Sequence, residues 1–107
     1  KEDCADLRNS RVPDIVRELR EYGCEVSVHD PLADPTAAAA ELSLNLVDWE
    51  DLQPCAALII AVPHRGYVAM DLDELTHSLS PNAIVIDVKG LVDRESCQKR
   101  GLTVWRL

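Results

Sequence analysis

The segment Ala56-Ala-Leu-Ile-Ile-Ala-Val62 is an unbroken run of apolar residues, and Pro63-His64-Arg65-Gly66 follows it at once. A strand with this pattern is buried on both faces of a parallel sheet, because a strand with one solvated face alternates apolar and polar residues. A second run of the same kind, Ala83-Ile-Val-Ile-Asp-Val88, ends at Lys89-Gly90. The two runs predict buried strands in an α/β protein.

Helical periodicity surrounds these runs. Apolar residues at helical spacing predict an amphipathic helix that follows Ser10 as its N-cap and ends at Gly23. The apolar face of this helix carries Val12, Ile15, Val16, Leu19 and Tyr22. A second helix is predicted over 34–41, because Asp34 is a good cap and Pro35 suits the first helical position.

The rest of the chain adds shorter elements. A strand rich in β-branched residues is predicted over 24–30, where Pro31 ends it. Leu72, Leu75 and Leu79 mark a third helix, which a turn at 80–82 follows. The remaining predictions are an extended piece over 44–47, a helical turn over 49–52, a helix over 93–100 and a strand over 102–105.

This alternation predicts a three-layer, Rossmann-like α/β sheet that is mostly parallel. In such a fold a strand precedes the first helix and lies in the middle of the sheet. We therefore expect that the usual first strand is missing before Lys1, and that the chain is a piece of a longer protein. An unfilled central position exposes backbone groups, and pairing with another copy would cover them, so a homo-oligomer is one expectation.

Length and composition limit the possible functions. We interpret residues 1–107 as a single domain, and the formal net charge of −8 argues against a basic surface that binds nucleic acid. No apolar run is long enough to cross a membrane and no signal peptide is recognisable, so we expect a cytoplasmic protein without a membrane partner.

The four cysteines are far apart and form no C-x-x-C pair. We therefore interpret them as reduced thiols and expect no metal site. Cys24 and Cys55 are expected near buried strands. Cys4 lies between Lys1 and Arg8, where a cation could activate a thiol, but the neighbouring Asp3 and Asp6 oppose this.

Ligands of parallel α/β sheets bind beyond the carboxyl ends of the strands. The candidate positions are Asp30-Pro31, Pro63-His64-Arg65 and Lys89-Gly90. The opening loop adds Lys1 and Arg8 before a helix N-terminus, which suits a phosphate-bearing partner, although a solvated turn explains the same residues. His64 is interpreted as a hydrogen-bonded turn residue, and Trp49 and Trp105 as packing residues.

The opening stretch carries a more specific signal. Lys1-Glu-Asp-Cys-Ala-Asp-Leu-Arg-Asn-Ser10 and the helix to Gly23 resemble the C-terminal domain of the UDP-glucose/GDP-mannose dehydrogenase family. The resemblance is to members that oxidise UDP-N-acetylhexosamines for bacterial surface polysaccharides. Val28-His-Asp-Pro31, Ala61-Val-Pro-His64 and Ile86-Asp-Val-Lys-Gly90 fall in the expected order, so the resemblance covers essentially the whole chain.

The resemblance implies a parent enzyme that uses NAD to oxidise the C6 alcohol of a UDP-sugar to a carboxylate. Its N-terminal and central domains, which are absent here, hold most of the NAD site and the catalytic cysteine. No G-x-G-x-x-G occurs in this chain, so the fragment is expected to have no catalytic residue and no activity of its own.

By the same resemblance, Lys1 and Lys89 bind the UDP-sugar, and Arg8 reaches toward the NAD cofactor. The chain departs from the family where Ala5 replaces a proline and where a strand with its Phe is absent before Lys1. The alternative is a stand-alone α/β interaction or regulatory module without nucleotide binding. The two hypotheses differ in whether the three cations converge on one edge of the fold.

Overall fold

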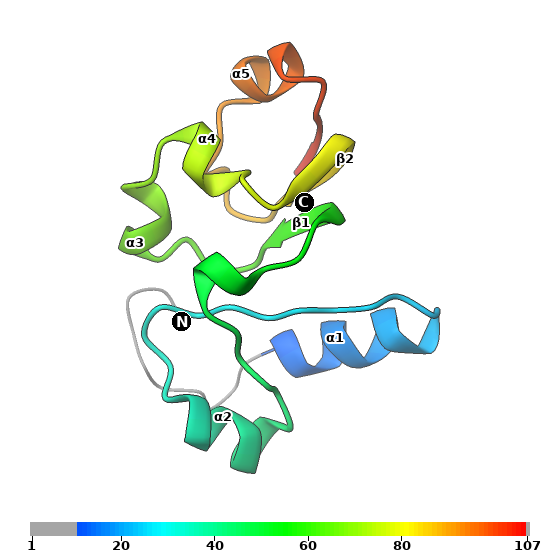
Figure 1. Ribbon diagram of the computed structural model, residues 1–107, viewed down its shortest axis with the longest axis vertical. Helices are drawn as coiled ribbons and strands as arrows, with labels where there is room; N and C mark the ends of the chain where they lie inside the picture. The colour runs from blue at the N-terminus through cyan, green and yellow to red at the C-terminus, as the bar shows by residue number, and fades with distance from the viewer. Residues whose placement is uncertain (1–10, 107) are drawn as a thin grey trace. The chain divides into compact units, whose positions relative to one another are not determined.

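The computed structural model describes residues 11–106, so Lys1, Cys4, Arg8 and the expected cap Ser10 lie outside the described residues. The described chain divides into two compact units, residues 11–52 and 53–106 (Figure 1). The interpretation of residues 1–107 as one domain stays a prediction. No described helix has the length and apolar character that crossing a membrane requires.

The first unit begins with the predicted amphipathic helix, α1 (Val12–Glu21). Gly23 has a φ of 88°, and this left-handed residue ends the helix as predicted. The N–H of Gly23 donates to the Arg20 carbonyl at 2.9 Å, and the N–H of Cys24 donates to the Leu19 carbonyl at 3.0 Å. These two bonds satisfy carbonyls that the end of a helix leaves unpaired.

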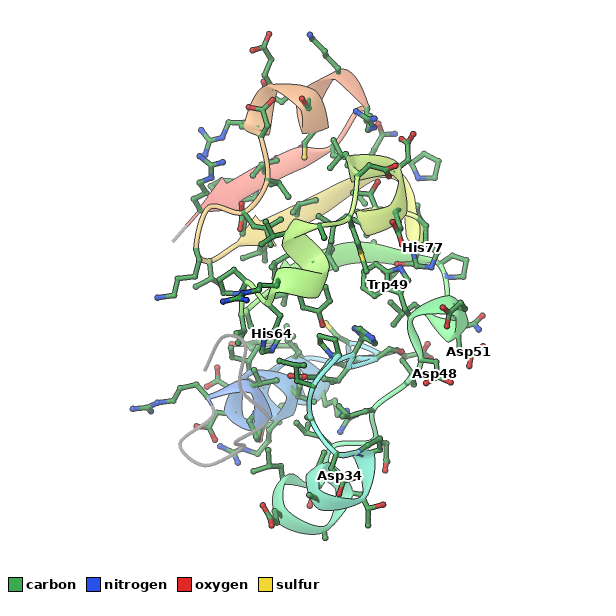
Figure 2. All side chains as sticks on the ribbon, turned by 90° about the vertical axis from the view of Figure 1, so that its left-hand side faces the viewer. Asp34, Asp48, Trp49, Asp51, His64 and His77 are labelled. Carbon is green, nitrogen blue, oxygen red and sulfur yellow. The ribbon has the colours of Figure 1, made fainter. Side chains whose placement is uncertain are left out.

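The second predicted helix is confirmed as α2 (Pro35–Leu42). The carboxylate of Asp34 accepts a hydrogen bond from the Thr36 N–H at 3.2 Å, and Figure 2 shows Asp34 at the start of this helix. The two helices share a small apolar core, in which the fully buried members are Val16, Ala38 and Leu44.

The strand predicted over 24–30 does not form a regular strand. Val28 makes one isolated parallel bridge with Leu46, in the extended piece predicted over 44–47. A strand needs a ladder of hydrogen bonds to a neighbour, and this segment has one bridge among the described residues. Cys24 is consequently exposed, contrary to the expectation that it lies near a buried strand. The unit ends with the short helix η1 (Trp49–Asp51), as predicted.

The second unit contains a three-stranded sheet with the order β1-β2-β3 (Figure 1). All of its pairings are parallel, which confirms the predicted α/β class. Its strands are β1 (Cys55–Ile60), β2 (Leu79–Asp87) and β3 (Thr103–Arg106). Its helices are α3 (Arg65–Val68), α4 (Leu72–Leu75) and α5 (Arg94–Lys99).

One face of this sheet carries the core of the unit. Leu58, Val85 and Val104 lie side by side in the register of the three strands, and Val85 is completely buried. On the other face Ile84 and Trp105 are exposed, so the packing role expected of Trp105 is not seen. The prediction that both runs are buried on both faces is therefore wrong in part, because Ile84 of the second run and Ala56 and Ala57 of the first run are exposed.

The segment between β1 and β2 differs most from its prediction. The third predicted helix stops after one turn at α4, and Leu79 instead begins β2. The turn predicted over 80–82 is present as an irregularity inside β2, where Asn82 has a left-handed φ of 63°. The pairing consequently jumps from Cys55 with Leu79 to Ala57 with Ile84.

Candidate functional site

The three strands of the second unit end together. Ile60, Asp87 and Arg106 are successive partners in the parallel register, so they form a row across the carboxyl edge of the sheet. The loops after β1 and β2 therefore leave from the same edge. This brings Pro63-His64-Arg65 and Lys89-Gly90 to one edge, as predicted, whereas Asp30-Pro31 belongs to the separately described first unit.

A buried carboxylate shapes the loop after β2. The side chain of Asp87 is completely buried, and its two oxygens accept hydrogen bonds from the N–H groups of Leu91 and Val92, each at 2.9 Å. Gly90 has a φ of 76°, which lets the chain turn back toward this carboxylate. The loop over 88–92 is thus folded over Asp87, while Lys89 is exposed.

Arg106 completes this arrangement from the neighbouring strand. Its Nε lies 3.8 Å from Asp87 Oδ2, and its Nη2 donates a hydrogen bond to the Val92 carbonyl. Hydrogen bonds to charged groups contribute about 1.5–3 kcal/mol each, so a buried carboxylate with these partners holds its loop firmly. Sequence reasoning missed both residues; the available signal was a single carboxylate inside an apolar run and a cation at the end of the last strand.

The loop after β1 carries a buried histidine. His64, labelled in Figure 2, is 2% exposed, and its backbone N–H donates to the Val62 carbonyl at 3.0 Å. Its carbonyl accepts from the Tyr67 N–H at 3.0 Å, and the two rings lie 5.9 Å apart. These contacts agree with the interpretation of His64 as a hydrogen-bonded turn residue. Arg65 follows it at the exposed start of α3.

The first unit has its own strand-end carboxylate. Asp30 accepts hydrogen bonds from the N–H groups of Leu32 and Ala33, at 2.8 and 2.9 Å. The preceding His29 packs edge-on against Trp49, with ring centroids 5.1 Å apart, which supports the packing role expected of Trp49. These residues form an ordered turn.

The first unit also has an open groove of about 530 Å³. Apolar side chains and two arginines line it: Pro13, Val16, Arg17, Arg20, Glu21, Leu42, Ser43 and Leu44. None of these is a residue that the sequence singled out for binding. The acidic partner of Arg17 is Asp14, at 2.8 Å. We therefore place the candidate site at the carboxyl edge of the sheet in the second unit.

The described cysteines are free thiols. Burial raises the pKa of the Cys97 thiol, so it is protonated and unreactive at neutral pH. Within residues 11–106, no group of three or more His, Cys, Asp or Glu side chains is arranged to hold a metal ion.

Of the three predicted binding cations, the structure describes one. Lys89 lies at the carboxyl edge of the sheet, in the exposed position that a ligand-binding residue requires. Lys1 and Arg8 lie outside the described residues, so their convergence with Lys89 stays a prediction.

In comparison with known proteins, this chain is similar to members of one family. Residues 1–94 match the model of the UDP-glucose/GDP-mannose dehydrogenase family, UDP binding domain. Protein CapL of Staphylococcus aureus is 36% identical over 107 residues, which is 100% of this chain and 25% of the relative. UDP-N-acetyl-D-glucosamine 6-dehydrogenase of Pseudomonas aeruginosa is 33% identical over 100 residues, or 94% of this chain and 24% of the relative.

A more distant relative is the UDP-N-acetyl-D-mannosamine dehydrogenase of Methanococcus aeolicus, which is 28% identical over 97% of this chain and 23% of its own length. The chain spans about a quarter of the length of these relatives.

Proposed function

Since this chain belongs to the UDP-glucose/GDP-mannose dehydrogenase family, we propose that it is the UDP-binding domain of a larger nucleotide-sugar dehydrogenase. The parent enzyme uses NAD to oxidise the C6 alcohol of a UDP-sugar to a carboxylate, in bacterial polysaccharide biosynthesis and in the cytoplasm. The relatives that are named as UDP-sugar dehydrogenases, each about four times as long as this chain, support this proposal.

The observation that carries the proposal is the loop over 88–92. It presents the exposed Lys89 at the carboxyl edge of a parallel sheet, where ligands of this fold class bind. The chain has a formal net charge of −8, so a diphosphate needs a local cation to offset the surrounding carboxylates. Charge-assisted hydrogen bonds from lysine suit phosphate oxygens.

We assign the remaining roles in the same way. Lys1 joins Lys89 in binding the diphosphate end of the UDP-sugar, and Arg8 reaches toward NAD, which the rest of the parent chain holds. Because catalysis requires those other parts of the parent, the present chain binds UDP but does not oxidise the sugar.

A calorimetric titration of the chain with UDP tests the proposal. We expect weak binding, about millimolar, because the parent supplies further contacts. Lys89→Ala should weaken binding at least about fivefold, since one charge-assisted contact is lost. Uridine should bind more weakly than UDP if the diphosphate is the group recognised.

Lys99→Ala is the matched control. Lys99 is also an exposed lysine of the second unit, 3.8 Å from Glu95 on α5, so its loss changes the net charge equally. Equal losses in the two variants would show that the chain attracts UDP only through its net charge. A folded chain that releases no heat with UDP would contradict the proposal and favour the interaction module.

A further inference from the structure

The loop that presents Lys89 is fixed at Val92, whose backbone N–H and carbonyl are both hydrogen-bonded to side chains. The N–H of Val92 donates to Asp87 Oδ2 at 2.9 Å, and its carbonyl accepts from Arg106 Nη2. Arg106 Nε lies 3.8 Å from the same Asp87 oxygen. Asp87, Val92 and Arg106 therefore form a closed ring of contacts around the base of the loop.

The sheet itself imposes this ring. Asp87 and Arg106 are direct partners in the parallel register of β2 and β3, so their side chains leave the same face of the sheet side by side. The guanidinium also lies near Gly90, because a Cβ built on this glycine would be 3.9 Å from Arg106 Nε. Arg106 thus lies close to the loop at the residue that follows Lys89.

The electrostatics require a cation at this place. A completely buried carboxylate is costly unless charge and hydrogen bonds compensate it. The fork of the arginine contacts the carboxylate and the loop carbonyl together, which the single ammonium of a lysine does less well. Without Arg106, the loop loses its bond at the Val92 carbonyl and the carboxylate loses its counter-charge.

We propose that Arg106 is a positioning residue for nucleotide binding: it fixes the loop over 88–92 so that Lys89 meets the diphosphate without first being ordered. Ordering a flexible segment at the moment of binding costs affinity. This inference rests on the proposed function, because it assigns a role in the same site. Arg106 lies beyond residues 1–94, which the family model matches.

A double-mutant cycle on the chain tests this role, with UDP affinity measured by nuclear magnetic resonance titration. The variants are Lys89→Ala, Arg106→Gln and the double variant. If Arg106 acts through Lys89, Arg106→Gln weakens UDP binding about fivefold when Lys89 is present and less than about twofold when it is absent. Arg106→Lys, which keeps the charge, should restore only part of the loss.

Amide hydrogen exchange gives a readout that needs no ligand. Arg106→Gln should speed exchange at the N–H groups of Leu91 and Val92, because both bonds to Asp87 depend on the fixed loop. Arg100→Gln is the control, since Arg100 pairs with Asp73 at 3.0 Å on another part of the same unit. It should leave exchange at both groups unchanged.

The outcomes separate the two proposals. If the unaltered chain does not bind UDP, both fall. If it binds, an equal loss from Arg106→Gln in both Lys89 backgrounds means that Arg106 contacts the nucleotide directly, and the positioning role is wrong. Unchanged exchange at Leu91 and Val92 in Arg106→Gln also overturns the positioning role, while the proposed function stands.

Discussion

Similar sequence patterns form different structures in the two units of this chain. In the second unit, apolar strand patterns become a three-stranded parallel sheet, whereas in the first unit the β-rich segment over 24–30 makes one bridge at Val28. Both segments end in an aspartate that accepts two backbone N–H groups, Asp87 in one case and Asp30 in the other. A strand pattern therefore becomes a strand only where the chain supplies a neighbour on which to build a ladder.

The two aspartates also differ in burial, and the one in the second unit is the more buried. Asp87 lies under a sheet edge and is completely buried, while Asp30 is half-buried in a turn. The first unit has a core of three fully buried residues between two helices, and the second has a packed sheet face. We therefore expect local stability to be greater in the second unit.

Each unit contains one of the two tryptophans of the chain, Trp49 in the first and Trp105 in the second. In Trp49→Phe the remaining tryptophan is Trp105, so its fluorescence reports on the second unit. In Trp105→Phe the remaining tryptophan is Trp49, and its fluorescence reports on the first unit. Each of these two backgrounds therefore gives a separate measure of the stability of one unit.

The largest difference is expected between the two strand-end aspartates. Asp87→Ala leaves two N–H groups without their acceptor and should lower the unfolding free energy of the second unit by about 3 kcal/mol. Asp30→Ala should lower that of the first unit by about 1 kcal/mol, because water reaches its turn. Urea titrations in the two tryptophan backgrounds measure both values. Equal losses would mean that burial does not separate the two turns.

A smaller difference is expected between two valines of strand-like segments. Val85 is completely buried at the centre of the sheet, so Val85→Ala should cost about 2 kcal/mol through lost burial and a cavity. Val28 is half-buried at the isolated bridge, and Val28→Ala should cost less than about 1 kcal/mol. A larger loss at Val28, in the same urea titrations, would show that the first unit depends on its bridge more than on its helices.

The cap of α2 provides a test confined to the first unit. Asp34→Ala removes the acceptor for the Thr36 N–H and should destabilise this unit by about 1 kcal/mol. Asp34→Asn keeps an acceptor and should recover most of the loss. Thermal unfolding followed by Trp49 fluorescence measures both variants. If Trp105 fluorescence shifts by the same amount, the two units unfold together.

The smallest effect is expected from the cap of α5 in the second unit. Hydrogen bonds from Ser96 hold the pKa of Asp93 below its usual value. Because the folded pKa lies below the unfolded one, about 3.9, this carboxylate stabilises the fold above that pH, and the contribution is lost as the pH falls through the folded pKa. Asp93→Asn should therefore lower the melting temperature slightly at pH 6 and less at pH 3. A gap that widens toward acid would contradict this cause.

Much of the fold follows from local signals in the sequence. The end of α1 at Gly23 and the start of α2 at Asp34 were predicted because a left-handed glycine and a cap act through the adjacent backbone. β3 was predicted within one residue at each end. The two helix boundaries depend on few residues that are close in the sequence, whereas β3 also requires its pairing with β2.

The wrong or missing predictions concern residues whose structure depends on contacts with residues far away in the sequence. Leu79 fits the helical spacing of Leu72 and Leu75, but it pairs with Cys55 of β1 and so begins β2. The sequence pattern includes Asp87 as part of an apolar strand, and only the folded loop shows that it accepts two N–H groups. For the site, the strand-end position of Lys89 was predictable from the order of strands, whereas the contact of Arg106 required the register of β2 and β3.

The rate at which the buried thiol of Cys97 is alkylated reports how often the second unit opens. Its raised pKa and complete burial protect it from alkylation in the closed state, whereas Cys24 in the first unit is exposed. Pulse-labelling with an alkylating reagent, followed by peptide mass mapping, would time the opening of the second unit without any substitution, with the exposed Cys24 as the reference thiol. Any ligand bound at the sheet edge would lengthen the interval before Cys97 is modified and leave the labelling of Cys24 unchanged.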